Sequence, residues 1–368
     1  MVVGKNLSDI INTNLSVDKW NVQHINSGQS GDSYLEETYQ GRVDIEQTSQ
    51  TKYLGFILSN KGSNMPQIDE VKKKSIWIIR KIFAKLESLN LKKYYFQSAV
   101  IFLNVILRSS ILYASETFYN LKETEVRHLE RIEETFLRKM FKTSKGCPIA
   151  QLYLESGHFP ARFAIMKSKL MFLKYLLEEN PNSLIYRFLK LQLENPTRGD
   201  WASSCLIDLK YLQINLSFEQ IEKMTKKQFN STIKESIQKR AFEYLIRKKK
   251  SKGKEIKYSE LKMADYLIPG YEQITINEQR NIFSIRNQMV EIPHNFPTTN
   301  EKEICRCREE VTMKHIYECE FFSENDKTDK PKFEQIYEGN LVQQKEINEI
   351  FQQNYQRRMK RIQENKPL

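Results

Sequence analysis

The chain has 368 residues, of which 40% are hydrophobic and 28% are charged, so it can bury a core and does not have the composition of a disordered protein. Its 58 lysines and arginines outnumber its 46 acidic residues, and the formal net charge is +12. Such a basic excess favours a polyanionic partner, with nucleic acid ahead of a membrane surface or an acidic protein. Five cysteines, together with no recognisable secretory signal, favour an intracellular, reducing environment.

The first 62 residues predict a small β portion. RVDIE at 42–46 alternates, and YLGFIL at 53–58 is a denser apolar run that predicts a strand, followed by the turn signal NKG at 60–62. No amphipathic helix separates these β signals, so they would bury little surface by themselves. We therefore expect residues 1–62 to resemble the last part of an α/β domain rather than a complete domain.

Helical periodicity dominates after residue 62. Pro66 suits a helix start, and apolar residues recur from Ile68 to Leu86. The apolar stretch at 96–114 contains Arg108 among other polar residues, which favours a buried helix over a membrane span. Further helices are predicted over 93–108, 122–141, 162–178 and 217–246. The expected fold class is mainly α with a small β portion at the N-terminus.

The segment CRCREEVTMKHIYEC at 305–319 holds three of the five cysteines and one of the five histidines. Three thiolates and an imidazole are a common tetrahedral zinc shell, and Cys305-x-Cys307 and His315-x₃-Cys319 each form a close ligand pair. A short helix would place His315 and Cys319 one turn apart on the same face. One residue between Cys305 and Cys307 is tighter than the usual two to four. Thiols without metal are therefore the alternative to a structural Zn²⁺ site.

Two basic clusters are candidate phosphate contacts. The first, RKKKSKGK, supplies Arg247, Lys248, Lys249, Lys250, Lys252 and Lys254. The second lies in the tail and supplies Arg357 and Arg358. Each phosphate contact would add about 0.9 to the salt slope of duplex binding. A solvated loop or helix end is the alternative for both clusters.

Familiar enzyme motifs are absent from the sequence. It has no phosphate-binding loop, dinucleotide fingerprint, zinc-protease helix or nucleophile elbow, and no Asp-Asp dipeptide. We therefore do not expect catalysis by this chain on its own.

The order of several segments carries a family resemblance. In chain order they are MVVGK at 1–5, TKYLGFILSNKG at 51–62, ILYASETF at 111–118, LERIEETFLRKMF at 129–141, PIAQLYLESGHFPARF at 148–163, GDW at 199–201, AFEYLIRKKKSK at 241–252, ELKMADYL at 260–267, IRNQMVEIPHNFP at 285–297 and the cysteine segment. Together they resemble the C-terminal half of a non-LTR (LINE-type) retrotransposon reverse transcriptase.

The resemblance implies a division into five parts. These are a palm end with primer-grip strands (1–62), a helical thumb (63–145), a helical connector with the basic run (146–270), a zinc-knuckle region (271–325) and a basic helical or disordered tail (326–368). It implies that thumb and connector grip template and primer, with Tyr53, Leu54 and Gly55 in the primer grip. It also implies that Cys305, Cys307, His315 and Cys319 are zinc ligands of a CCHC knuckle, although the family usually places two residues between the first two cysteines.

The resemblance places the catalytic aspartates of such a polymerase upstream of Met1. Polymerisation needs carboxylates that hold two metal ions about 4 Å apart, and no candidates are recognisable here. We therefore favour a truncated, non-catalytic protein that binds RNA, DNA or their hybrid, with a nuclear location implied by the resemblance and suited by the basic runs. An inactive fragment of a longer RNA-directed DNA polymerase and a helical scaffold that binds a protein partner remain alternatives.

Overall fold

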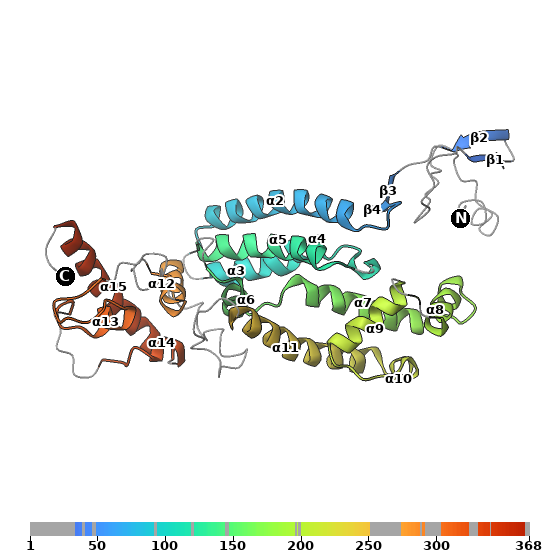
Figure 1. The fold of residues 1–368 in the computed structure, drawn as a ribbon. Coiled ribbons are helices and arrows are strands. Elements are labelled where there is room, and N and C mark those ends of the chain that lie inside the picture. Colours follow the sequence, from blue (N-terminus) through green and yellow to red (C-terminus); the bar gives the residue numbers. More distant parts are fainter. Residues whose placement is uncertain are drawn as a thin grey trace.

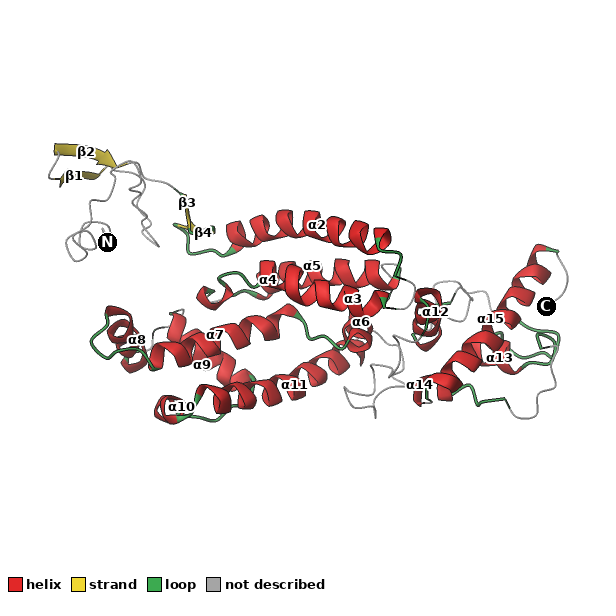
Figure 2. Ribbon diagram, turned by 180° about the vertical axis from the view of Figure 1, so that it is seen from behind, coloured by secondary structure: helices red, strands yellow, loops and turns green. Residues whose placement is uncertain are grey.

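The computed structural model describes residues 34–38, 41–45, 49–91, 94–118, 121–143, 147–195, 197, 200–250, 274–287, 289–290, 303–323, 330–338 and 340–364. Over these residues the chain is mainly helical, with small antiparallel sheets near its N-terminal end (Figure 1). Figure 2 shows the same arrangement from behind. The predicted fold class is confirmed.

The strands form two hairpins. They are β1 (Tyr34–Thr38) with β2 (Gly41–Ile45), and β3 (Gln50–Tyr53) with β4 (Phe56–Ser59). The prediction of one strand over 53–58 is wrong, because the chain reverses at Leu54 and Gly55, whose φ angles are 46° and 85°. Positive φ at both central residues is the signature of a two-residue type I′ turn, whose twist matches that of the flanking strands.

The first group of helices follows these hairpins. It contains α2 (Met65–Ser88), α3 (Tyr95–Phe102), the π-helical turn η2 (Leu103–Leu107), α4 (Arg108–Ile111), the 3₁₀ turn η3 (Ser115–Thr117), α5 (Glu123–Phe141) and α6 (Ile149–Ser156). Pro66 lies in the first turn of α2, as predicted. The helix predicted over 93–108 exists, but a π-helical turn interrupts it. Among the described residues, no helix combines the length and the apolar character needed to cross a membrane.

A second group of helices packs beside the first. It contains α7 (Ala161–Leu177), α8 (Leu184–Glu194), α9 (Trp201–Tyr211), α10 (Phe218–Lys223) and α11 (Lys226–Lys250). The prediction of one helix over 217–246 is wrong, because a new helix begins after Thr225. The Gln228 N–H donates to Thr225 Oγ1 at 3.2 Å, and the Thr225 N–H donates to Gln228 Oε1 at 2.9 Å. This reciprocal capping box starts α11 and separates it from α10.

The C-terminal helices gather at one end of the molecule (Figure 1). They are α12 (Ile276–Arg286), α13 (Met313–Glu318), α14 (Gln335–Glu338) and α15 (Leu341–Gln363). Phe283 of α12 stacks on Phe141 of α5, with 4.2 Å between ring centroids and 20° between ring planes. One hydrophobic core continues from α2 and α5 through α12 to Ile316 and Phe351, and a second core lies among α7, α9 and α11. The cysteine segment is therefore packed against the helical body.

His158 lies buried just after α6 and gives a pH-dependent prediction. Its Nδ1 is 2.7 Å from the Ser156 carbonyl oxygen and its Nε2 is 3.1 Å from the side-chain oxygen of Asn104. Burial, with a smaller contribution from Arg108, lowers the pKa of His158 from 6.5 to about 4. As the pH falls below 6.5, the unfolded state takes up this proton first, so the folded state loses stability until about pH 4.

We expect the His158→Gln variant to lack this acid sensitivity. Between pH 7 and pH 4.5, its free energy of unfolding should fall by about 2–3 kcal/mol less than that of the wild type. Urea denaturation of both proteins at both pH values measures the difference, and any fixed cost of the substitution cancels. An identical pH dependence in the two proteins would show that His158 titrates normally.

Candidate metal centre

Cys305, Cys307, His315 and Cys319 present four ligand atoms that all lie within 4.8 Å of one another. The Sγ atom of Cys319 is 3.8 Å from that of Cys305 and 3.9 Å from that of Cys307. Cys307 Sγ is 3.4 Å from His315 Nε2. Tetrahedral Zn²⁺, with usual bond lengths, requires about 3.8 Å between sulfurs and about 3.6 Å between sulfur and nitrogen. These three distances are close to those of a tetrahedral metal, and all four predicted ligands lie close enough together that they could hold one metal ion.

A tight turn accommodates the short spacing of the first two cysteines. The Cys305 N–H donates to the Glu309 carbonyl at 2.9 Å, and the Arg308 N–H donates to the Cys305 carbonyl at 2.8 Å. An antiparallel bridge joins Ile304 and Glu310 beside this turn. Arg308 has a φ of 71°, a left-handed conformation that closes the loop. Both thiols consequently reach the same cluster although one residue separates them.

Helix α13 supplies the second ligand pair. Thr312 begins the helix, and its Oγ1 accepts a hydrogen bond from the His315 N–H at 3.0 Å. At the other end, the Cys319 N–H donates to the His315 carbonyl at 2.9 Å. His315 and Cys319 therefore lie one turn apart on the same side of the helix, as predicted.

Helix α15 contacts the cysteine segment itself and the residues just before and just after it. The Asn354 side-chain amide donates to the carbonyls of Ile316 and Tyr317 at 2.9 and 3.3 Å. Arg357 donates to the carbonyl of Phe322 at 3.0 Å. Arg358, which is 4% exposed, binds both carboxylate oxygens of Glu303. These contacts fix the position of the cluster relative to the rest of the molecule.

The contacts of α15 correct one predicted phosphate contact. Arg358 is buried, and Glu303 neutralises its charge at a distance of 2.7 Å between Nε and Oε1, so it cannot also meet a phosphate. Arg357 is engaged with the Phe322 carbonyl on the same helix. Arg358, which is buried, and Arg357, which is partly exposed, both bind residues that flank the cysteine segment.

The Cys319 thiol is poorly ionised without a cation. Burial raises the pKa of Cys319 to about 12; the Phe321 N–H acts to lower it, and the neighbouring thiols of Cys305 and Cys307 act to raise it. Burial also lowers the pKa of His315, which keeps its imidazole neutral and able to coordinate. Metal binding requires thiolates and would release protons, so affinity for a metal should increase with pH.

The predicted primer-grip residues lie at a separate place. Tyr53 and Leu54 are exposed at the tip of the β3–β4 hairpin, where Leu54 is 76% exposed. The Tyr113 hydroxyl donates to the Leu54 carbonyl, and a Cβ atom at Gly55 would contact the Tyr113 side chain at 3.5–3.8 Å. Tyr113, which the sequence did not single out, therefore fixes the conformation of this tip.

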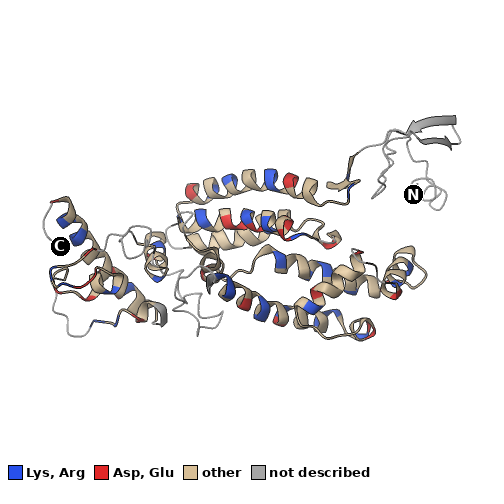
Figure 3. Ribbon diagram, viewed as in Figure 1, with Lys and Arg blue, Asp and Glu red and all other residues tan. Residues whose placement is uncertain are grey.

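The first four residues of the predicted basic run, 247–250, form the C-terminal end of α11. Arg247 and Lys248 lie near the end of the helix, where Figure 3 shows basic residues. Lys249 and Lys250 belong to α11, but their side chains are outside the described residues, as are Lys252 and Lys254 entirely. The resembling segments at 1–5 and 260–267 also lie outside the described residues.

A cleft with a volume of about 720 Å³ adjoins Arg247 and Lys248. Its lining contains five basic groups and three acidic groups: Arg127, Arg131, Arg162, Arg247 and Lys248, against Glu123, Glu130 and Glu134. The cleft is therefore positive on balance. Of its basic residues, only Arg247 and Lys248 were predicted from the sequence, because the five come from three different helices.

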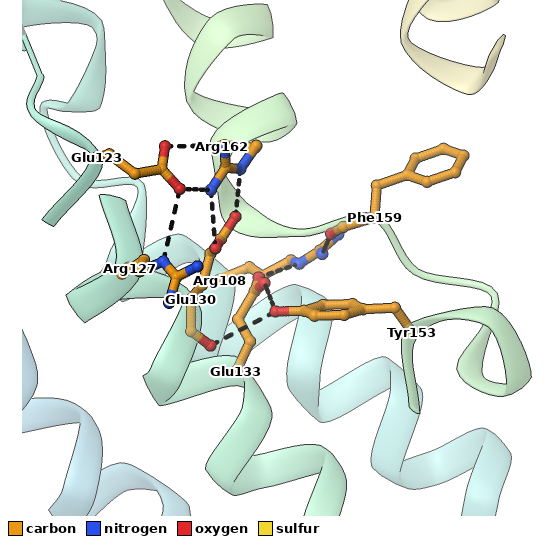
Figure 4. Close-up of polar contacts among 8 residues, drawn as sticks. All are labelled: Arg108, Glu123, Arg127, Glu130, Glu133, Tyr153, Phe159 and Arg162. Atoms are coloured by element: carbon orange, nitrogen blue, oxygen red, sulfur yellow. Dashed lines mark hydrogen bonds and ion pairs between the residues drawn. The ribbon is translucent and has the colours of Figure 1, made fainter. Parts of the chain in front are cut away.

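Arg162 organises the wall of this cleft (Figure 4). Its guanidinium binds Glu130 at 2.5 and 3.0 Å and Glu123 at 2.8 and 3.2 Å. Deeper in the same region, Arg108 donates to Glu133 at 2.8 Å, and the Tyr153 hydroxyl donates to the other oxygen of that carboxylate at 3.0 Å. These ion pairs and hydrogen bonds join α4, α5, α6 and α7 beside the cleft.

No protein-family model, curated protein or solved structure matches the chain. The fold and the site define a mainly helical protein with a Cys₃His cluster that could hold a metal ion.

Proposed function

We propose that this protein is a non-catalytic nucleic-acid-binding protein with a structural zinc site, related to the C-terminal half of non-LTR retrotransposon reverse transcriptases. The observation that carries the proposal is the set of four Cys and His ligand atoms within 4.8 Å. Thiolate and imidazole ligands suit Zn²⁺ among the common metals. Four protein ligands fill a tetrahedral shell and leave no position for a substrate, which supports a structural role.

Two basic surfaces would bind phosphates, one beside the metal site and one distant from it. Arg306 and Arg308 alternate with the cysteine ligands and are exposed. Arg127, Arg247 and Lys248 line the positive cleft at the end of α11. Contacts of this kind recognise charge and shape, and carry no base-specific information by themselves.

Binding to a fluorescent RNA–DNA hybrid across a salt series tests this function. We expect the logarithm of the association constant to fall steeply and linearly with the logarithm of the salt concentration. Replacing Arg247 and Lys248 by glutamine should reduce the slope by about 1.8, because each lost phosphate contact removes about 0.9. The matched control replaces Lys226 and Lys227, which are exposed at the opposite end of α11, and should keep the slope. Weak binding that does not change with salt would contradict the proposal.

A protein-binding scaffold is the second candidate, and the surface of α8 favours it. Leu184, Phe188 and Leu191 follow helical spacing on one face and are 77%, 60% and 57% exposed. Single exposed apolar residues are ordinary, but several on one helix are typical of interaction surfaces. This function predicts binding that is insensitive to salt and lost when Phe188 is replaced by lysine, while hybrid binding is unchanged.

A further inference from the structure

A second pocket is lined by residues of α7 and α11 and by residues around α4. In Figure 1, α7 and α11 lie away from α13 and α15, the helices around the cysteine segment. Its volume is about 510 Å³, which is within the usual range for small-molecule sites. Its apolar lining residues are Leu112, Phe159, Phe163, Ala164, Met171 and Ile237. A ligand here would meet a largely apolar wall.

The charged lining of this pocket is basic. Lys167 on α7 and Lys234 on α11 line it together with Ser168 and Gln238, and no acidic residue is among the described lining residues. Arg108 also reaches the pocket, but Glu133 neutralises it at 2.8 Å. Lys167 and Lys234 form no ion pair with any residue that the structure describes. Their two positive charges are therefore left without a counter-charge.

In the absence of a ligand, the positive charges of the two lysines repel each other. Lys167 is partly buried, and burial, together with the nearby charge of Lys234, lowers its pKa. A bound anion would relieve both effects. Two ammonium groups match a dianion best, and a phosphate monoester carries about −1.5 to −2 at pH 7, whereas a carboxylate carries a single charge.

We propose that this pocket binds a nucleotide through its phosphate monoester. The phosphate lies between Lys167 and Lys234, and Ser168 and Gln238 offer further hydrogen bonds. The base packs on the apolar wall beside Phe159, as bases do on aromatic side chains. The same chemistry is offered by a free nucleotide and by the phosphorylated end of a strand.

Isothermal titration with adenosine 5′-monophosphate tests the proposal. We expect saturable binding to the full-length protein, and at least tenfold weaker binding of adenosine and of inorganic phosphate, each of which lacks one half of the ligand. Replacing Lys167 or Lys234 by glutamine should weaken binding by about 10- to 100-fold. Lys239→Gln, an exposed lysine on the same helix outside the pocket, is the matched control and should bind normally.

A 5′-phosphorylated trinucleotide distinguishes the two sources of the phosphate. Binding tighter than that of the mononucleotide indicates a strand end, whereas equal or weaker binding indicates a free nucleotide. Either result supports the pocket if it depends on both lysines. Binding that is absent at millimolar concentration, or unchanged in both lysine variants, would overturn the proposal.

Two further variants separate ligand binding from folding. Ala164→Leu should fill the pocket and abolish nucleotide binding although both lysines remain. Lys167→Gln should leave the thermal midpoint of the free protein unchanged or higher, because it removes a repulsion, whereas a lysine that supports the fold would lower it. The inference is independent of hybrid binding, since Arg247→Gln/Lys248→Gln protein should still bind the mononucleotide.

Discussion

Replacing Arg162 by methionine is expected to lower the free energy of unfolding by about 3–5 kcal/mol. Arg162 joins α7 to α5 through Glu130, at 2.5 Å, and Glu123 (Figure 4). The side chains of Arg162 and Glu130 are only 10% and 6% exposed. Without the guanidinium, the Glu130 carboxylate would remain buried without the cation that donates hydrogen bonds to it, which costs more than the intact pair contributes. Urea denaturation followed by circular dichroism measures the loss.

Arg127 provides the matched control for this substitution. It contacts Glu123 at 3.6 Å, and its side chain is 54% exposed, so Arg127→Met should change stability by no more than about 0.5 kcal/mol. The double variant Arg162→Met/Glu130→Gln should recover part of the loss, because an uncharged amide is less costly to bury than a carboxylate. Similar small effects at Arg162 and Arg127 would show that the buried cluster does not hold α5 and α7 together.

Loss of one metal ligand should have the second large effect. Metal binding in small zinc sites contributes an apparent free energy on the order of 10–16 kcal/mol, and much of it acts as folding energy. We expect Cys319→Ser to lower the zinc content from about one per chain to near zero. Hydrogen exchange should then accelerate over 303–323 and in the part of α15 around Asn354, while α2 and α5 stay protected.

Arg306→Ser is the matched control for the ligand substitution. Arg306 is exposed in the same turn, between Cys305 and Cys307, but offers no ligand atom to the cluster. This variant should keep both the zinc and the slow exchange. If Cys319→Ser retained zinc and protection equally well, the cluster would not be the metal site.

Local patterns in the sequence predicted correctly those helices in which one continuous apolar face runs from the first residue to the last. Helix α5 at Glu123–Phe141 follows the expected range of 122–141 closely, because the apolar periodicity continues over the whole of that stretch. The break before α11 was missed because apolar spacing continues across it, from Ile221 to Phe229, and hides the Thr225 cap. At 53–58, a run of apolar residues concealed a turn that only the positive φ angles of Leu54 and Gly55 reveal.

For the candidate sites too, only features that lie within one short segment could be predicted from the sequence. The four metal ligands were predictable because they lie within one short segment, and their chemistry is rare elsewhere in the chain. Arg358 was misjudged because its partner, Glu303, lies 55 positions away and the ion pair forms only when the helices pack. The lysines of the nucleotide pocket were missed for the same reason, since Lys167 and Lys234 meet across two helices.

Native mass spectrometry of the purified protein, after removal of loosely bound metal, tests the metal centre most directly. We predict one zinc ion per folded chain, and loss of this ion in the Cys307→Ser variant. Folded wild-type protein that carries no metal even after incubation with excess zinc, with all three thiols of the cluster open to alkylation, would contradict the assignment.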